Sequence, residues 1–238
     1  EEDLDFLEHY PEDPTEEERE KARHLCAVEP AVPWSVLAIT FTNKAAGELK
    51  ERLERRLGAA AGDIWASTFH SACVRILRRD AEKIGFDKNF TIYDTDDSKR
   101  VVKEVVKHLG FEEKAFPPRD VLAVISNSKD KYETAQDFAE TWGESSDWRM
   151  KRMSRIYTEY QRRLKEANAM DFDDIIFHTV ALLQKDRETR AFYQRKFRYI
   201  LVDEYQDTNH LQYLLTSLLA GGYQNLCVVG DDDQSIYR

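Results

Sequence analysis

The feature that most constrains the fold is a short apolar run that ends in acidic side chains. Residues 197–202 are mostly aromatic, aliphatic or β-branched and show no regular polar alternation. Such a run predicts a fully buried strand of the kind found in parallel sheets. Asp203 and Glu204 follow it directly, and Gln206 and Asp207 come next. We therefore expect an α/β fold in which this strand delivers carboxylates to one edge of the sheet.

Acidic side chains in this position have a chemical use. The carboxyl ends of strands are where open α/β sheets bind their ligands. An Asp there can hold Mg²⁺ through water, and a neighbouring Glu can polarise an attacking water. Asp203 is thus the candidate Mg²⁺ ligand and Glu204 the candidate catalytic residue. The alternative is a plain acidic turn before a helix capped by Thr208 or Asn209, and this pair alone would favour that alternative.

Composition sets the size and class of the protein. The chain has 238 residues, of which 42% are hydrophobic and 34% charged, enough for one domain with an inserted lobe. The apolar runs are too short to span a membrane and the N-terminus is acidic, so we expect neither a membrane anchor nor a signal peptide. Three widely spaced cysteines suit a reducing cytoplasm, the expected location, and argue against a cysteine metal site.

The net charge of −10 is unevenly distributed. Residues 1–20 carry eleven acidic side chains and one basic side chain, whereas the remainder carries 34 of each. The acidity therefore belongs to the N-terminal segment. A neutral body can still present a local basic groove, so the overall charge does not exclude nucleic acid as a partner.

Patterning along the chain predicts a discontinuous α/β domain. Residues 1–14 are expected to be poorly ordered, and Thr15 to begin a helix that ends near Val28. Further strands are predicted at residues 35–40, 64–70 and 226–231. The segment between them is mostly helical in pattern. The expected organisation is an acidic N-terminal segment and helix (1–33), an α/β motor subdomain (34–84 and 169–238) and an inserted helical subdomain (85–168).

Polar signatures follow the predicted strands in a characteristic order. They are Thr40-Phe41-Thr42-Asn43-Lys44-Ala45-Ala46, Thr68-Phe69-His70-Ser71, Asp203-Glu204-Tyr205-Gln206-Asp207 and the segment 230–238, with Asp171-Phe172-Asp173-Asp174-Ile175 between the second and third. In this order and spacing they resemble the UvrD/PcrA/Rep family of superfamily 1 DNA helicases. The resemblance covers residues 34–238, and the combination is far more specific than any one motif.

The resemblance implies a RecA-like P-loop NTPase-type α/β domain with an inserted helical subdomain, incomplete in this chain. It implies ATP-dependent 3′-to-5′ translocation on single-stranded DNA and duplex unwinding, with ATP and Mg²⁺ as cofactors. The implied partners are single-stranded DNA, duplex junctions and proteins of repair or replication. DNA repair, replication restart and recombination are the implied settings.

The resemblance also implies roles for individual residues. Asp203 would hold Mg²⁺, Glu204 would orient or deprotonate the attacking water, and Gln234 would sense the γ-phosphate. Gln206 and Asp207 would couple the nucleotide site to neighbouring motifs. The residues implied in DNA binding are Phe41, Thr42, Asn43, Thr68, His70 and Tyr237.

Structural roles remain open as alternatives for several of these residues. Phe41 could belong to the core, Asn43 could simply cap a helix, and His70 and Tyr237 could serve packing alone. Basic residues in the helical region could contact a duplex, but interleaved acids make a solvated face the favoured interpretation. These residues are Lys129, Lys131, Arg149, Lys151, Arg152, Arg155, Arg162 and Arg163.

The sequence departs from the family pattern at its phosphate-binding loop. Family members carry a G-x-x-x-x-G-K-[ST] loop upstream of the strand that begins near Ser35, yet the first glycine of this chain is Gly47. We therefore expect the chain alone not to hydrolyse ATP efficiently. Two other functions stay open: the helicase portion of a recombination helicase–nuclease, and a catalytically dead module that binds DNA or a partner protein.

Overall fold

The computed structural model describes residues 2–231, and the chain divides into two units, Glu1–Val32 and Pro33–Arg238. The first unit contains α1 (Glu2–Glu8) and α2 (Glu16–Cys26), neither of which has a buried residue among those described. Thr15 and Glu18 form the predicted capping box at the start of α2. The prediction that residues 1–14 lack order is wrong for α1. Acidic side chains in its first turn suit the helix dipole, and the Phe6 ring contacts Tyr10 at 5.9 Å.

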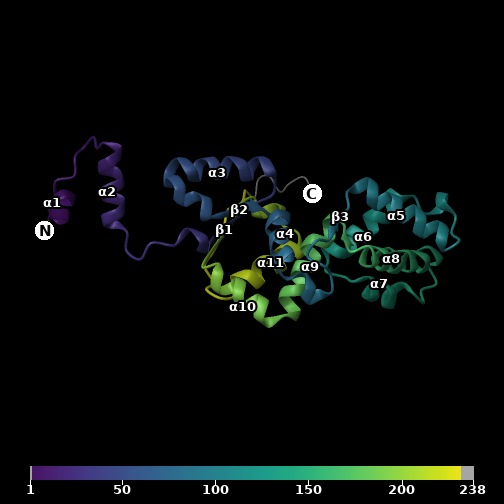
Figure 1. Cartoon of the computed structure of the whole chain (residues 1–238). Coiled ribbons are helices and arrows are strands. Elements are labelled where there is room, and N and C mark those ends of the chain that lie inside the picture. Colours follow the sequence, from purple (N-terminus) through teal and green to yellow (C-terminus); the bar gives the residue numbers. More distant parts are fainter. Residues whose placement is uncertain (1, 232–238) are drawn as a thin grey trace. The chain divides into compact units, whose positions relative to one another are not determined.

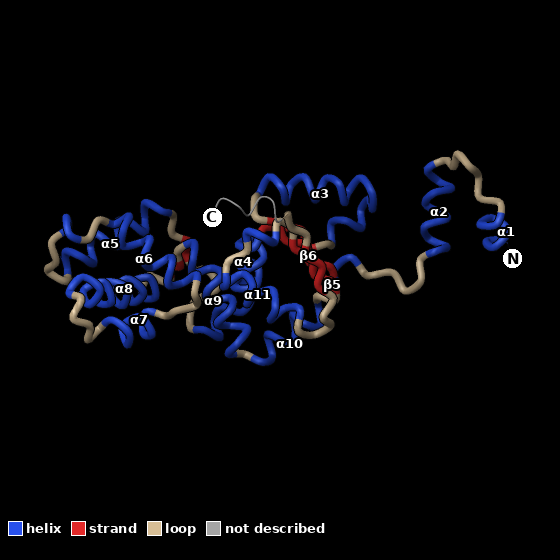
Figure 2. The backbone as a smooth tube through the Cα atoms, turned by 180° about the vertical axis from the view of Figure 1, so that it is seen from behind, coloured by secondary structure: helices blue, strands red, loops and turns tan. Residues whose placement is uncertain are grey.

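A parallel sheet forms the centre of the second unit (Figure 2). Among the described residues it contains β1 (Val36–Thr40), β2 (Trp65–Thr68), β5 (Tyr199–Val202) and β6 (Leu226–Val228), in the order β2-β1-β5-β6. Thr40 pairs in register with Thr68, and Ile39 pairs with Val202. The carboxyl ends of β1, β2 and β5 therefore meet at one edge of the sheet. The predicted α/β fold class is confirmed.

Helices cover both faces of this sheet (Figure 1). On one face, Leu37, Ile39, Ile200 and Val202 belong to a core that includes residues from four helices. These helices are α4 (Phe69–Asp80), α9 (Phe172–Lys185), α10 (Arg187–Lys196) and α11 (His210–Ala220). On the other face, α3 (Asn43–Leu57) packs against β1 and β2.

The prediction that the strand before Asp203 is fully buried is wrong. Ile200 and Val202 are buried, but Leu201 between them is 40% exposed. Leu201 pairs with Cys227 of β6, which is also exposed. The described part of α3 packs on β1 and β2, so the same face of β5 and β6 is left accessible. The aliphatic run therefore led to a prediction of more burial than this strand has.

The helical region has a hydrophobic core of its own. Val102, Val105, Ile156 and Tyr160 are buried in it, and they come from two of its four described helices. The helices are α5 (Thr95–His108), α6 (Pro118–Asp130), α7 (Ala135–Trp142) and α8 (Trp148–Glu166). Short 3-10 turns complete the described elements at Pro33–Ser35, Gly58–Asp63, Ala81–Ile84, Glu113–Ala115 and Tyr205–Asp207.

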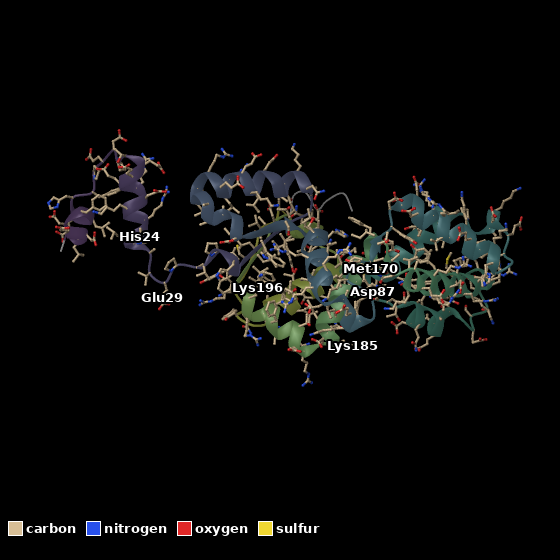
Figure 3. The ribbon with its side chains drawn as sticks, in the orientation of Figure 1. His24, Glu29, Asp87, Met170, Lys185 and Lys196 are labelled. Atoms are coloured by element: carbon tan, nitrogen blue, oxygen red, sulfur yellow. The ribbon has the colours of Figure 1, made fainter. Side chains whose placement is uncertain are left out.

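Two short parallel strands connect the helical region to the α/β part. They are β3 (Thr91–Ile92) and β4 (Ala169–Met170), and neither was predicted because two residues carry no alternation pattern. The Tyr93 amide donates to the Met170 carbonyl at 2.9 Å. The Asp87 amide donates to the Asn168 side chain, also at 2.9 Å, and Asp87 and Met170 lie close together in Figure 3. The subdomain boundaries at 85 and 168 stay a prediction.

Candidate nucleotide and nucleic-acid site

Two helices begin side by side at the carboxyl edge of the sheet, directly after β1 and β2. The Thr42 hydroxyl caps α3 by accepting a hydrogen bond from the Ala45 amide at 3.1 Å. The Thr68 hydroxyl caps α4 by accepting from the Ser71 amide at 3.3 Å. Adjacent helix N-termini present backbone amides and positive dipole ends, which favour anions such as phosphates.

The position of Asn43 settles one of the alternatives. Thr42, not Asn43, is the cap of α3, so the interpretation of Asn43 as a capping residue is wrong. Asn43 is the first residue of the helix and is exposed. Its side chain is therefore open to solvent at this edge.

Phe41 packs partly into the core and keeps part of its surface exposed. It is half-buried, and its ring meets the edge of the buried Phe69 ring with centroids 5.3 Å apart. Packing on Phe69 fixes the ring, while its remaining surface faces solvent beside the two helix N-termini. A ring held in this way can offer a stacking face at low entropic cost.

His70 is joined here by a residue that sequence reasoning missed. The Phe172 ring stacks on the His70 ring with centroids 3.7 Å apart and planes 21° apart, and Phe172 is 59% exposed. Phe172 is the first residue of α9, which is buried on nearly every side from Asp174 to Leu183. Beside such a run, an additional Phe is indistinguishable in sequence from one more core residue.

The His70 ring is neutral at physiological pH. Burial lowers its pKa to about 4, and a hydrogen bond with the Phe172 backbone only partly opposes this effect. His70 therefore supplies no positive charge to a phosphate. What it offers at this edge is an aromatic ring and a hydrogen-bonding nitrogen.

The acidic pair lies at the end of the neighbouring strand β5. The Asp203 amide donates to the Ile39 carbonyl at 3.0 Å, which brings the end of β5 next to the end of β1. Glu204 adopts a left-handed conformation with φ 52° and ψ 40°. Strained conformations of this kind persist where surrounding contacts impose them, often at functional sites. The carboxylates of Asp203 and Glu204 are both exposed.

Gln206 connects the acidic turn to the loop after β6. Its Nε2 donates to Glu204 Oε2 at 2.6 Å, and its Oε1 accepts from the Asp231 amide at 3.0 Å. A Cβ at Gly230 would lie 2.8 Å from Gln206 Oε1, so a larger residue there would force the Gln206 side chain to shift. The geometry suits the coupling role expected for Gln206. Asp207 ends the short 3-10 turn and is exposed.

The side chains at this edge could hold Mg²⁺ only together with water and substrate phosphates. Within residues 2–231, no three His, Cys, Asp or Glu side chains are grouped as a metal site would require. Mg²⁺ commonly takes one or two carboxylates and completes its shell with water and substrate phosphates. Asp203, exposed beside Glu204, fits such a ligand role. Gln234 and Tyr237 lie outside the described residues.

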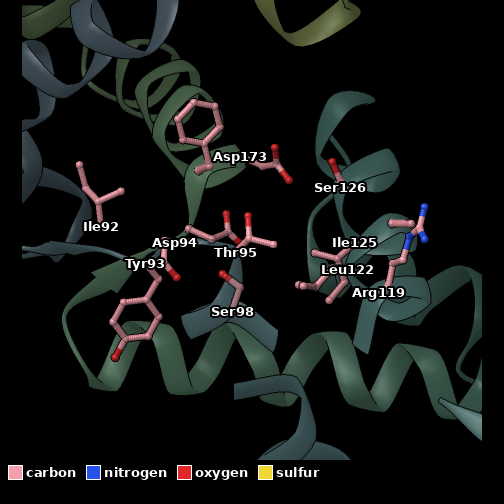
Figure 4. Close-up of a pocket in the computed structure, with 13 residues that line it drawn as sticks. Ile92, Tyr93, Asp94, Thr95, Ser98, Arg119, Leu122, Ile125, Ser126 and Asp173 are labelled. Carbon is pink, nitrogen blue, oxygen red and sulfur yellow. The ribbon is translucent and has the colours of Figure 1, made fainter. Parts of the chain in front are cut away.

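A cavity of about 560 Å³ opens next to Phe172, between the starts of α5 and α9 and the side of α6 (Figure 4). Asp94, Asp173, Ser98 and Ser126 line it, with Arg119 also contributing. Burial and the charge of Asp171 raise the pKa of Asp173. The carboxylates of Asp94, Asp171 and Asp173 in its lining disfavour the binding of phosphate inside this cavity.

Five of the eight basic residues named above for the helical region have acidic partners. Arg162 and Arg163 both bind Glu159, Lys151 pairs with Glu144, and Arg149 with Asp120. These pairs favour the solvated-face interpretation. Lys129 cannot contact a duplex, because it is fully buried and ion-paired with Asp171 and Asp174. In the described part of the chain, the helices are also too short or too polar to cross a membrane.

Comparison with known proteins agrees with this geometry. Residues 19–238 match the model of the UvrD/REP helicase N-terminal domain. The chain is 50% identical over 215 residues to the ATP-dependent DNA helicase PcrA of Bacillus subtilis, covering 90% of this chain and 29% of that protein. It is 51% identical over 205 residues to PcrA of Staphylococcus aureus (strain Mu50), covering 86% of this chain and 28% of that protein. The chain thus spans less than a third of the length of these relatives. It belongs to the UvrD/Rep helicase family and corresponds to its N-terminal domain.

Proposed function

We propose that this chain is the part of an ATP-dependent 3′-to-5′ DNA helicase that grips single-stranded DNA and carries the hydrolytic acids. The observation that carries the proposal is the shared edge of the sheet. There the ends of β1 and β2 present Phe41, Asn43 and His70, and the end of β5 presents Asp203 and Glu204. The proposed setting is DNA repair, replication restart or recombination in the bacterial cytoplasm.

On the DNA side, each element has a distinct task. The N-termini of α3 and α4, with Thr42, Asn43 and Thr68, would hold phosphates through amides and hydroxyls. The rings of Phe41 and of the His70–Phe172 stack would support bases, as aromatic faces do in single-strand binding proteins. Tyr237 is proposed to add a further ring.

On the nucleotide side, Mg²⁺ bound to ATP would neutralise charge on the phosphates. Asp203 would hold that ion through water, and Glu204 would orient the attacking water. Gln206 keeps the Glu204 carboxylate in one place and ties it to Asp231. Gln234 is proposed as the group that distinguishes ATP from ADP.

The experiment is a Glu204→Gln substitution in the full-length protein. The amide keeps the size and the hydrogen bond to Gln206 but cannot act as a base, so ATP turnover should be abolished while ATP binding remains. Ser217→Ala in α11 is a control remote from the sheet edge. Retained turnover in Glu204→Gln would refute the role given to Glu204.

A second candidate is a module that binds DNA without hydrolysing ATP. The observation in its favour is that no glycine precedes Gly47, so no phosphate-binding loop lies in that stretch. Titration of the chain with a fluorescent ATP analogue and Mg²⁺ separates the two. Binding that disappears in Asp203→Ala supports the helicase function, and DNA binding without nucleotide binding supports the module.

A further inference from the structure

The last turn of α6 ends in two consecutive residues, Lys129 and Asp130, that bind different elements of the α/β part. Lys129 reaches the start of α9, and Asp130 reaches the start of α11. Helix α9 carries Phe172, and α11 follows the acidic turn. The arrangement gives the inserted helical region a direct connection to both sides of the proposed site.

The Lys129 contacts are short and buried. Its Nζ lies 2.6 Å from Asp171 Oδ2 and 2.8 Å from Asp174 Oδ1, and none of the three side chains is more than 8% exposed. The Tyr160 hydroxyl of α8 also donates to Asp171 Oδ2 at 2.9 Å. Burial alone would lower the pKa of Lys129, but the charges of the two carboxylates outweigh it and raise the pKa. The lysine therefore stays charged.

These contacts act on the first turn of α9. Asp171 is the cap of that helix, and Asp174 completes its capping box. Phe172 lies between them in sequence and stacks on His70. Holding the capping box with a buried cation therefore fixes the direction in which Phe172 leaves the helix.

Asp130 makes the corresponding contact with the other side. Its Oδ1 accepts a hydrogen bond from Asn209 Nδ2 at 2.7 Å. Asn209 is the cap of α11, where its Oδ1 accepts from the Gln212 amide at 2.9 Å. The short turn Tyr205–Asp207, which contains Gln206, ends two residues earlier. Asn209 thus links Asp130 to the segment that positions Glu204.

We propose that Lys129 and Asp130 are positioning residues that couple the start of α9, with Phe172, to the segment 204–212. A ligand that reorders one end changes the other through the end of α6. The proposed coupling is argued from the contacts above. It rests on the proposed function only for the identity of the ligands, DNA at α9 and nucleotide at the acidic turn.

The first test needs no ligand. Amide hydrogen exchange of the chain is compared in the unaltered protein, Asp130→Ala, Asp130→Asn and Lys131→Ala, the last being an exposed neighbour. Loss of one side-chain hydrogen bond should make the amides of Asp207, Gln212 and Tyr213 exchange roughly two- to tenfold faster in Asp130→Ala. Asp130→Asn keeps an oxygen acceptor and should restore protection, and Lys131→Ala should change nothing.

The same experiment repeated with an oligo(dT) strand tests the coupling. In the unaltered chain and in Asp130→Asn, the strand should change exchange both at the start of α9 and at residues 204–212. In Asp130→Ala the change should be confined to α9. Lys129→Met is a supporting variant only, because two carboxylates left together in the interior can unfold the region.

The proposal is overturned if Asp130→Ala exchanges as the unaltered chain does, or if Asp130→Asn is as perturbed as Asp130→Ala. It is also overturned if bound oligo(dT) leaves residues 204–212 unchanged in the unaltered chain, or if its effect still reaches them in Asp130→Ala. Failure of the strand to bind at all contradicts the proposed function instead, and the ligand-free comparison then decides this inference.

Discussion

Phe172 and His70 stack with ring centroids 3.7 Å apart, although they lie on different helices and are 102 positions apart in the chain. One ring comes from α4, which directly follows β2, and the other from α9, which follows the inserted helical region. The stack therefore joins the two segments of the α/β part at the edge where the strands end. Its outer ring, Phe172, is exposed.

Phe172→Ala should weaken binding of single-stranded DNA to the chain. Stacking of a base on an aromatic ring is worth about 1–3 kcal/mol, so the dissociation constant should rise by about five- to 150-fold. Fluorescence anisotropy with a labelled oligonucleotide measures the change. Tyr213→Ala is the matched control, because Tyr213 is an exposed aromatic residue of α11 at 49% exposure. Equal effects of the two substitutions would show that Phe172 has no particular role.

The neutral state of His70 predicts a dependence of stability on pH. Its pKa is lowered from 6.5 to about 4 by burial, so between these values the unfolded chain binds more protons than the folded chain. The His70 contribution to the free energy of unfolding is therefore constant above pH 6.5 and decreases as the pH falls toward 4. Denaturant unfolding of the chain and of His70→Gln, which does not titrate, measures this. The stability difference between them should shrink or reverse as the pH falls, and parallel profiles would contradict it.

Gly230→Ala should impair ATP turnover of the full-length protein. The added Cβ would stand 2.8 Å from Gln206 Oε1 and displace the side chain that holds Glu204. Steady-state hydrolysis should show a lower kcat with ATP binding largely retained, because Asp203 is not displaced. Gly47→Ala is the matched control, since a Cβ there meets nothing within 4 Å. An unchanged kcat in Gly230→Ala would contradict the role of Gln206 in holding Glu204 for ATP turnover.

Lys129→Ala should strongly destabilise the chain. It leaves Asp171 and Asp174 buried without their cation, and breaking a buried pair in this way costs about 3–5 kcal/mol. Denaturant unfolding should show this loss. Lys131→Ala, two positions along and exposed, should change the free energy of unfolding by no more than about 0.5 kcal/mol. Similar stabilities for both variants would show that the ion pairs contribute little.

Much of the α/β part could be predicted from sequence because its signals are local. The strand ending at Thr40 is an apolar run followed by a capping residue, and the capping box that begins with Asn209 has a recognisable spacing. Asp203 and Glu204 could be placed at a strand end for the same reason. The β3–β4 pair escaped, since it depends on a contact between residues about 80 positions apart.

The missed features of the candidate site depend on tertiary contacts. In the sequence, Lys129 cannot be distinguished from a solvent-exposed lysine. Only the fold shows that two carboxylates at the start of α9 surround it. Phe172 reads as a core residue, but its position at the very start of α9 leaves it exposed beside His70. The accessible face of β5 likewise depends on where α3 packs, which an apolar run does not encode.

The most direct test of the central claim is binding of single-stranded DNA to this chain, measured by fluorescence anisotropy over a salt series. The unaltered chain is compared with a variant carrying Phe41→Ala and Phe172→Ala together. The account predicts that binding weakens as salt rises, because phosphates are held electrostatically. It also predicts that the double substitution lowers affinity without changing the salt slope, because the rings carry no charge. Absence of binding at low salt, or equal affinity of the two proteins, would contradict the claim that this sheet edge grips DNA.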